Sequence, residues 1–145
     1  MFLGQYKYSI DSKGRLTVPV RFRAALSSGA FITQGFDRNL IVYTTESFER
    51  MASRATSVTS TNPEARVMRR VIFSRAQELI LDATGRVLIP SFLRDYAGIQ
   101  ADAYVVGAGE YIEIWQAENW EKVLEDVSDP AANARRFEPF DLSSG

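Results

Sequence analysis

The sequence contains neither cysteine nor histidine among its 145 residues. Without cysteine the chain can form no disulfide framework and no thiolate metal site. Without histidine it lacks the commonest general base and a common metal ligand, which argues against most hydrolase and zinc chemistry. The carboxylates are scattered and no glycine-rich phosphate loop is present. We therefore expect a protein that is not an enzyme and that uses no metal or cofactor.

Long apolar runs are missing as well. No segment approaches the ~20 consecutive apolar residues of a membrane-spanning helix, and the N-terminus lacks the apolar centre of a signal peptide. We therefore expect a cytoplasmic protein that does not contact a membrane. A hydrophobic content of 46% in a chain of this length is enough for one globular domain, or for two half-domains that share a core.

One short stretch occurs twice. Residues 11–19 read DSKGRLTVP and residues 82–90 read DATGRVLIP. In both copies an Asp-x-x-Gly-Arg turn is followed by three apolar or β-branched residues and a proline. A stretch that recurs in this way indicates a repeated unit, which usually cannot bury its apolar face alone.

The match extends beyond the turn. Arg23 is matched by Arg94 at the same offset, and after one inserted residue Gly35 is matched by Gly107. Residues 5–50 and 76–122 are therefore two versions of one unit.

Alternation, turn residues and helix signals predict the same order of elements in both units: strand, turn, strand, short helix, β-hairpin and longer helix. In the first unit we expect strands at 6–10 and 16–18 around a turn at 11–14, a short helix at 20–26, hairpin strands at 30–34 and 40–44, and a longer helix from 45. In the second unit we expect strands at 77–81 and 87–89 around a turn at 82–85, a short helix at 90–97, hairpin strands at 103–106 and 111–116, and a longer helix at 117–127. Pro19 is expected at the first position of its helix. A helix over 63–74 that begins at Asn62-Pro63 should separate the units, and a short helix is expected near 131–136.

These elements predict a mixed α/β fold, of the α+β kind, in which two β-turn-β, helix and hairpin repeats form a pseudo-two-fold shared core. The expected boundaries are 5–47 for the first repeat, 48–75 for a helical, arginine-rich linker, 76–119 for the second repeat and 120–145 for the end of the last helix and the tail.

The net charge of −1 conceals an asymmetry between the two halves. Residues 1–75 carry twelve Lys and Arg against five Asp and Glu, whereas residues 76–145 carry five against thirteen. A basic half favours a surface for a polyanion. The alternative is that the two halves attract each other between subunits. The linker arginines (Arg66, Arg69, Arg70 and Arg75) could form a second basic strip, but we expect them to pair with the acidic unit of a neighbouring chain.

Arg15 and Arg86 are the leading candidates for contacts with a ligand. Each follows a glycine at the mouth of a tight turn, and the planar guanidinium suits a phosphate or the O6/N7 edge of guanine. The structural alternative is a local ion pair that only fixes the turn. The two interpretations are compatible, because an aspartate can also orient the guanidinium. The residues expected to support the turns are Asp11, Gly14, Asp82 and Gly85.

Lys13 and Lys7 add positive charge to the first unit only, since their counterparts are Thr84 and Glu78. The first turn should therefore bind phosphate more strongly than the second. For Lys7 the alternative is an ordinary solvated side chain on a strand. The aromatic residues that recur at matching positions are expected in the core or in a subunit interface.

The chain resembles the MraZ family of bacterial transcription regulators and the wider AbrB/SpoVT group of swapped-hairpin DNA-binding proteins. The resemblance lies in the two Asp-x-x-Gly-Arg motifs, their Pro-x-x-Phe/Leu-Arg continuations, the N-terminal Met-Phe-Leu-Gly and the arginine-rich linker. It implies two AbrB-like repeats in each chain and several chains in a ring. It also implies that the ring binds short direct repeats upstream of the division and cell-wall gene cluster, which includes the regulator's own gene.

We therefore predict a nucleoid-associated transcriptional regulator that acts as a homo-oligomeric ring on double-stranded DNA, with no small-molecule substrate. Arg15, Arg86, Lys13 and Lys7 are its predicted DNA contacts. The alternative function is a protein-binding assembly module whose contact with DNA is incidental.

Overall fold

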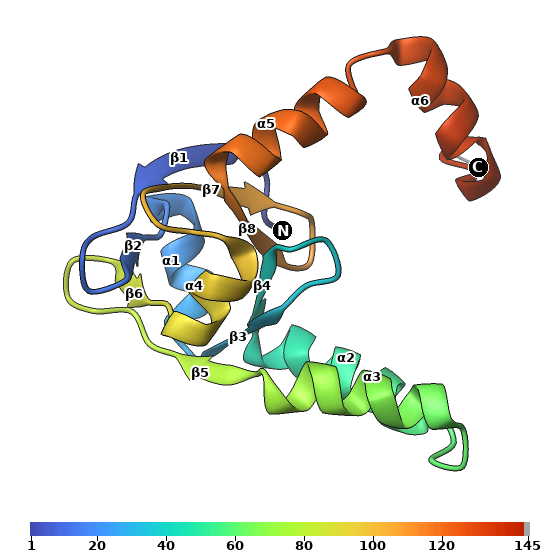
Figure 1. Ribbon diagram of the computed structural model, residues 1–145, viewed down its shortest axis with the longest axis horizontal. Coiled ribbons are helices and arrows are strands. Elements are labelled where there is room, and N and C mark those ends of the chain that lie inside the picture. The colour runs from blue at the N-terminus through green and yellow to red at the C-terminus, as the bar shows by residue number, and fades with distance from the viewer. Residues whose placement is uncertain (144–145) are drawn as a thin grey trace.

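The computed structural model describes residues 1–143 (Figure 1). Along the chain its elements are β1 (Gln5–Ser9), β2 (Arg15–Thr17), α1 (Val20–Leu26), β3 (Ala30–Gln34), β4 (Leu40–Thr44), α2 (Thr45–Ser57), α3 (Pro63–Ser74), β5 (Gln77–Leu79), β6 (Arg86–Leu88), α4 (Ser91–Ala97), β7 (Asp102–Gly107), β8 (Ile112–Gln116), α5 (Ala117–Asp126), α6 (Pro130–Phe137) and the 3-10 helix η1 (Glu138–Phe140). The predicted order of elements is confirmed in both repeats.

The strands of the two repeats are interleaved. An antiparallel sheet has the strand order β1-β7-β8-β4-β3-β5, and a separate two-stranded ribbon consists of β2 and β6. In the sheet, β1 of the first repeat pairs with β7 of the second, and β5 of the second pairs with β3 of the first. β1 and β2, although joined by a turn, therefore belong to different sheets. Each repeat supplies strands that only the other can pair.

The ribbon defines a pseudo-two-fold axis. Leu16 and Val87 lie directly opposite each other, and they occupy equivalent positions in the two repeats. Both side chains are buried, while the neighbouring pairs Arg15–Leu88 and Thr17–Arg86 face the other side of the ribbon. The fold is thus the mixed α/β arrangement with two repeats around a shared core that the sequence predicts.

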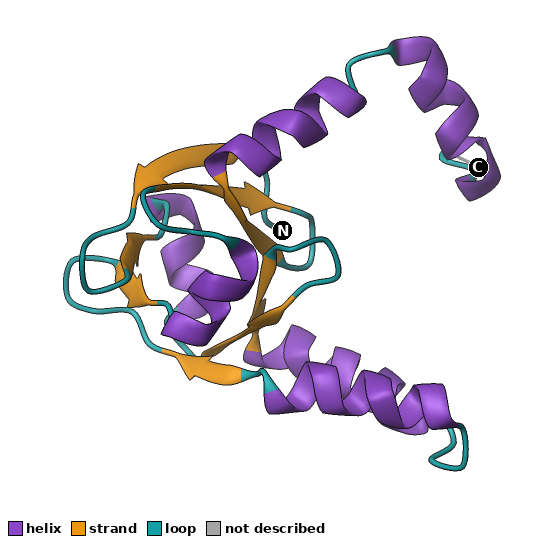
Figure 2. Cartoon of the chain, in the orientation of Figure 1, coloured by secondary structure: helices purple, strands orange, loops and turns teal. Residues whose placement is uncertain are grey.

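The sheet curves around α1 and α4, and the ribbon closes the open side of this arrangement (Figure 2). The two short helices bury Phe22 and Leu26 from α1 and Leu93 and Ala97 from α4. These side chains join one apolar cluster with residues from both repeats. Burial of each large aliphatic or aromatic side chain contributes about 1.5–3 kcal/mol, so neither repeat keeps its share of the core without the other.

α2, α3 and α5 contact the outer face of the sheet and extend away from it (Figure 1), and most of the repeated aromatic residues lie at these contacts. Phe31 of β3 stacks on Phe48 of α2 with ring centroids 4.6 Å apart. The second repeat places Trp115 of β8 against Trp120 of α5 at 5.6 Å. These aromatics attach the longer helices to the sheet.

Two of the linker arginines act within the chain. Arg69 donates from Nη2 to the carbonyl oxygen of Thr56 at 2.9 Å, and it also contacts the carbonyl of Val58 at the end of α2. The last carbonyls of a helix lack partners along the helix, so Arg69 caps α2. Arg66 donates to the carbonyl of Ser60 at 2.9 Å. These contacts give both arginines a role in holding the α2–α3 hairpin, and their pairing with a neighbouring chain stays a prediction.

Several predicted element boundaries are wrong by one or two residues. β5 ends at Leu79 instead of residue 81, because only residues 77–79 find partners on β3. Pro19 precedes the first helical residue of α1, and its extended backbone, with ψ of 139°, places it outside the helix. Pro90 does the same before α4.

The match of Gly35 with Gly107 is also shifted. The bond from Gly35 N–H to the Asn39 carbonyl has its counterpart in the bond from Ala108 N–H to the Tyr111 carbonyl. Gly35 therefore corresponds to Ala108. Two residues are inserted before β7, and the hairpin loop that follows is one residue shorter, so the sequence offset returns to 72 at β8.

We predict that fragments 1–56 and 60–145, expressed separately, will show no cooperative thermal transition. Each fragment loses partner strands for the sheet and for the ribbon, and with them about half of the shared core. Circular dichroism melting of each fragment, with the intact chain as the control, tests this. A cooperative transition from either fragment as a monomer would contradict the shared core.

Candidate nucleic-acid interface

The two Asp-x-x-Gly-Arg turns have the same internal structure. In the first, Oδ1 of Asp11 accepts from the backbone N–H of Lys13 at 3.0 Å and from that of Arg15 at 2.8 Å. Oδ2 of Asp11 accepts from Nε of Arg15 at 2.6 Å. The aspartate therefore holds both the backbone of the turn and the guanidinium that follows it.

The second turn repeats these contacts with one addition. Oδ1 of Asp82 accepts from the backbone N–H groups of Thr84 and Arg86, and its Oδ2 accepts from Nε of Arg86 at 3.1 Å. The hydroxyl of Thr84 also donates to Asp82 at 2.9 Å. The local Asp–Arg pair is thus present in both turns, which leaves both interpretations of these arginines in place.

The ribbon brings the two turns together at one end of the molecule (Figure 1). Nη1 of Arg86 lies 3.7 Å from the same Asp11 oxygen that Arg15 contacts. Arg15 and Arg86 share the outer face of the ribbon, and about a third of each side chain is exposed. Two guanidinium groups from different repeats are therefore held side by side with room for a further partner.

Arg23 and Arg94 also belong to this end of the molecule, although sequence reasoning did not select them as site residues. Nε of Arg23 donates to the carbonyl of Val18 at 2.9 Å, and Nε of Arg94 to that of Ile89 at 3.0 Å. Each guanidinium then packs against the turn glycine of the opposite repeat, Arg23 against Gly85 and Arg94 against Gly14. The identity of these arginines at matched positions was the available signal.

Gly14 and Gly85 are required for two reasons. Their φ values are +85° and +79°, a region that residues with a Cβ rarely adopt. A Cβ on Gly14 would stand 2.7 Å from Nε of Arg94, and one on Gly85 would stand 2.2 Å from Cζ of Arg23. The glycines therefore admit the arginine of the other repeat under each turn.

The turns lower the pKa of their aspartates. The backbone N–H of Arg86 is the main cause that brings the pKa of Asp82 from its ordinary value of 3.8 to about 2, with further donation from Thr84. The backbone N–H of Arg15, followed by its guanidinium, lowers the pKa of Asp11 in the same way. Both carboxylates are therefore ionised near neutral pH, where they can orient the arginines.

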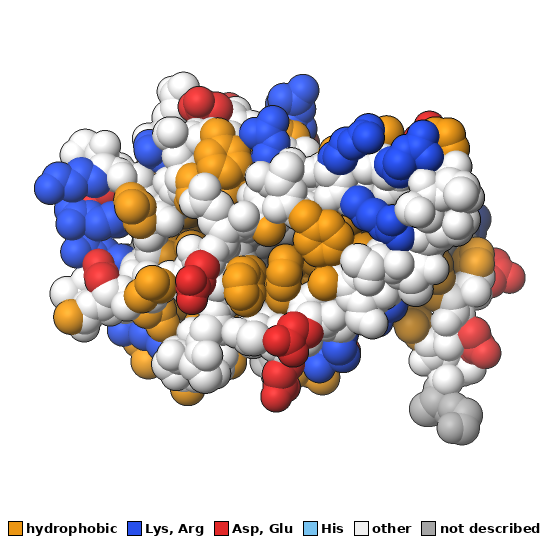
Figure 3. Space-filling model, turned by 90° about the horizontal axis from the view of Figure 1, so that it is seen from below, with side chains coloured by type: hydrophobic (Ala, Val, Ile, Leu, Met, Phe, Trp, Pro, Cys, Tyr) orange, Lys and Arg blue, Asp and Glu red, His pale blue; other side chains and the backbone are white. Residues whose placement is uncertain are grey.

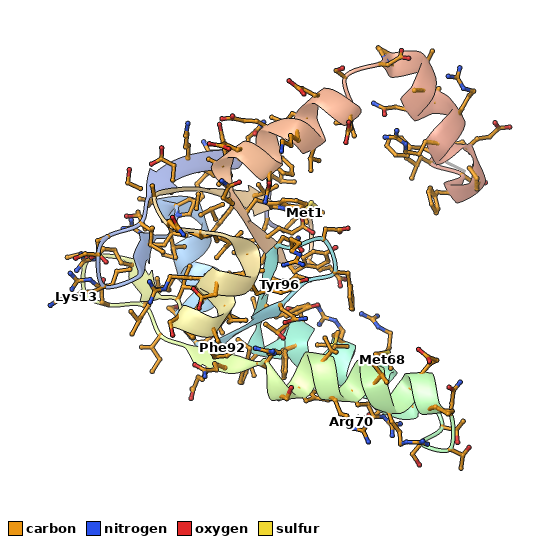
Figure 4. The ribbon with its side chains drawn as sticks, in the orientation of Figure 1. Met1, Lys13, Met68, Arg70, Phe92 and Tyr96 are labelled. Carbon is orange, nitrogen blue, oxygen red and sulfur yellow. The ribbon has the colours of Figure 1, made fainter. Side chains whose placement is uncertain are left out.

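The two turns differ at their tips. Lys13 projects from the end of the first turn into solvent (Figure 4). Within residues 1–143 its amino group has no acidic group within 4.0 Å. Thr84, its counterpart, is engaged by Asp82. We call the group of Lys13, Arg15, Arg23, Arg86 and Arg94, with Asp11 and Asp82, the two-turn surface.

Lys7 lies elsewhere. Its amino group is 3.7 Å from Glu121 of α5 and 5.7 Å from the ring centre of Tyr104 on β7. The structure therefore brings Lys13, Arg15 and Arg86 together, but it places Lys7 against α5, where an acidic group offsets its charge.

The two-turn surface gathers five cations and two carboxylates from the turns, the ribbon and the helices α1 and α4 at one end of the molecule. Arginine pairs of this kind can bind phosphates or reach base edges in a groove. The interleaved repeats and the paired turns define the class: the chain is a mixed α/β protein of two repeats that exchange strands around a shared core.

Comparison with known proteins identifies the family within this class. The family described as "MraZ protein, putative antitoxin-like" matches residues 1–71 and 72–138. A protein of Herpetosiphon aurantiacus named transcriptional regulator MraZ is 44% identical over 131 residues, which cover 90% of this chain and 92% of that protein. Proteins of the same name from Roseiflexus castenholzii (42% identity, 94% of each chain) and Heliobacterium modesticaldum (37% identity, 98% of this chain and all of that protein) are also similar. The chain belongs to the MraZ family of transcriptional regulators.

The family is named for regulation and not for a catalytic activity. Among the helices of residues 1–143, none combines the length and the apolar character that crossing a bilayer would need.

We predict that Gly14→Ala will cost more stability than Gly98→Ala. Both glycines have positive φ, +85° and +69°, so both substitutions carry a backbone cost of about 1–2 kcal/mol. Only the Cβ at position 14 meets a neighbour, the guanidinium of Arg94. Displacement of Arg94 should add roughly 1 kcal/mol or more, measured by urea unfolding. Equal losses in the two variants would show that Arg94 does not restrain the turn.

We also predict a specific pH dependence for Asp82→Asn. The folded pKa of Asp82, about 2, lies below the ordinary 3.8, so the unfolded chain binds the proton more tightly. The stabilisation by this carboxylate is complete above pH 3.8 and is lost as the pH falls towards 2. The stability difference between wild type and Asp82→Asn should therefore shrink through this window in acid titrations of unfolding. A difference that is independent of pH would contradict the assigned contacts.

Proposed function

We propose that the protein regulates transcription by binding promoter DNA through the two-turn surface. The observation that carries the proposal is the placement of Arg15 and Arg86, from different repeats, against one oxygen of Asp11. Each guanidinium makes its Asp contact through Nε to a carboxylate. This arrangement leaves Nη donors of Arg15 available for a phosphate oxygen or a guanine edge.

The turns supply the remaining positive charge for the DNA backbone. Lys13 extends beyond the first turn, and Arg23 and Arg94 lie behind the two glycines. Contacts to phosphates position a protein on the duplex, while contacts to base edges select the sequence. We assign Lys13 to phosphate and the pair Arg15 and Arg86 to the groove. Lys7 remains a predicted contact of lesser weight, because Glu121 offsets its charge.

The ring-shaped homo-oligomer is the second part of the proposal. The family resemblance supports a ring that acts on short direct repeats upstream of the division and cell-wall gene cluster, including the regulator's own promoter, and so associates with the nucleoid. One two-turn surface offers only a small contact area. Several of them in one ring can bind spaced repeats together, and such linked binding raises affinity by roughly 10²–10⁴ without any new contact.

The alternative function, a protein-binding assembly module, makes a different prediction about preference for the operator. Binding through phosphates weakens as salt rises: the logarithm of the binding constant falls with the logarithm of the salt concentration, with a slope of about −0.9 for each neutralised phosphate. Binding by a specific regulator also prefers the operator over unrelated DNA. Incidental binding would show the salt dependence without the preference.

We predict that Arg15→Ala will lower affinity for operator DNA by about 1–3 kcal/mol per engaged site, with little change in melting temperature. A partly exposed Asp–Arg pair contributes little to folding, so stability should hardly change. Arg15→Lys keeps the charge but not the planar fork, and should keep non-specific binding while losing preference for the operator. Titration of fluorescent promoter DNA and a thermal melt on the same variants make the measurement.

Two controls sharpen this test. Lys13→Ala should flatten the salt dependence of binding, whereas Thr84→Ala, at the matching position, should leave it nearly unchanged. Asp11→Ala should reduce both stability and operator preference, since it releases the turn and both arginines. If Arg15→Ala destabilises the fold yet leaves specific binding intact, the arginine is only part of the turn and the proposal fails.

A further inference from the structure

An apolar groove lies beside β5 in the second repeat. It has a volume of about 500 Å³, and Ile80, Leu88, Pro90 and Phe92 supply its apolar lining. Ile80 is 74% exposed and Leu88 is 59% exposed. Seen from below, apolar side chains gather on this face between the basic end of the molecule and the basic side chains at its other end (Figure 3). β5 is also an edge strand of the sheet.

The first repeat provides an internal comparison. Its positions equivalent to Ile80, Leu88 and Phe92 are occupied by polar residues, namely Ser9, Thr17 and Arg21. The same backbone arrangement therefore folds with a polar surface at these positions. The fold does not require the apolar groove of the second repeat, and exposed apolar surface of this kind marks an interaction site.

The C-terminal arm, residues 128–143, lacks the support that its own apolar residues need. It contains α6 and η1, neither of which has a buried residue. Phe140 is 69% exposed and Leu142 is 80% exposed. An eight-residue helix is too short to be stable alone in water, so it needs a surface to pack on. Figure 1 shows the arm leaving the body at the side opposite β5, so its own groove is out of reach.

Basic residues border the groove, and the end of the arm is acidic. Arg75 lies 5.5 Å from the ring centre of Phe92, and Arg70 is exposed on the neighbouring α3. The last part of the arm, residues 138–143, carries Glu138 and Asp141 and no basic residue. The end of the arm, which is apolar and carries two acidic residues, thus suits a groove bordered by Arg70 and Arg75. Glu78 also lines this groove, and Arg135 and Arg136 precede the acidic end of the arm.

We propose that the C-terminal arm of one copy of the chain packs into the β5 groove of the next copy. The contact joins two different surfaces, so it is head-to-tail, and repeated head-to-tail contacts close into a ring when the rotation allows. The inference rests on the ring in the proposed function and identifies the surfaces that build it. Leu88 of the groove pairs with Arg15 across the ribbon, so the contact borders the two-turn surface.

The absence of cysteine makes this contact directly testable. Differently tagged Ile80→Cys and Phe140→Cys chains are co-expressed and oxidised, and the disulfide between tags is measured on a non-reducing gel. Ser9→Cys, at the position equivalent to Ile80, replaces Ile80→Cys in the control. We expect the Ile80–Phe140 combination to crosslink and the Ser9–Phe140 combination not to. Equal crosslinking in the two combinations, none in either, or crosslinks only between identical Ile80→Cys chains, overturns the proposal.

A second variant measures assembly without DNA. Ile80→Ser installs the residue of the first repeat at a position outside the ribbon, and the circular dichroism spectrum should stay unchanged. Removal of buried aliphatic contacts should weaken association in sedimentation by roughly ten- to a hundredfold. Unchanged assembly of this folded variant, or a wild-type chain that is monomeric at low micromolar concentration, overturns the arm-to-groove contact. DNA binding by the isolated variant at high concentration separately tests the two-turn surface, so failure of one proposal is not failure of the other.

Discussion

The pairing of β2 with β6 is the constraint on which the rest of the structure depends. A three-residue strand cannot form a sheet with its own repeat once the preceding strand has paired elsewhere, so each repeat relies on the other. The pairing buries Leu16 against Val87 and closes the core over α1 and α4. It also fixes the position of the turns, because the chain enters each ribbon strand directly from an Asp-x-x-Gly-Arg turn. The packing of the core and the position of the basic residues therefore have one cause.

The two turn aspartates lie within a basic surface, where they orient the arginines that surround them. Asp11 accepts two backbone donors and contacts two guanidinium groups, one from each repeat. Such half-exposed ion pairs add little to folding stability, so their main effect is orientation. An arginine whose rotamer is already restrained loses less entropy when it meets a phosphate or a base. Arg23 and Arg94 complete this arrangement from beneath the opposite turn, which couples the geometry of one repeat to the other.

The two repeats share a backbone but not a surface. The first turn carries Lys13 where the second carries Thr84, and the second repeat has an apolar groove where the first is polar. In a symmetric dimer of identical chains both copies would have to carry the same residues. Joining the two units in one chain removes this requirement, so one repeat can specialise for charge and the other for contact with a neighbour. A head-to-tail assembly uses that difference, since it needs two unlike surfaces on each copy.

The sequence by itself determined the elements, the repeat and the turns. Local signals are sufficient for these: glycine at positive φ, proline before a helix, and aspartate that accepts from the next backbone groups, as at Asp11 and Asp82. The ion pairs within each turn follow from the same short spacing. Only the tertiary structure decided that β1 and β2 separate into different sheets, that Arg86 reaches Asp11, and that Arg94 lies under Gly14. The tertiary structure also places Lys7 against α5, away from the turns, and places the Arg69 guanidinium at the end of α2. These contacts join residues far apart in the chain, and their partners depend on which strands exchange between repeats, a choice set by burial of the shared core and not by any local pattern.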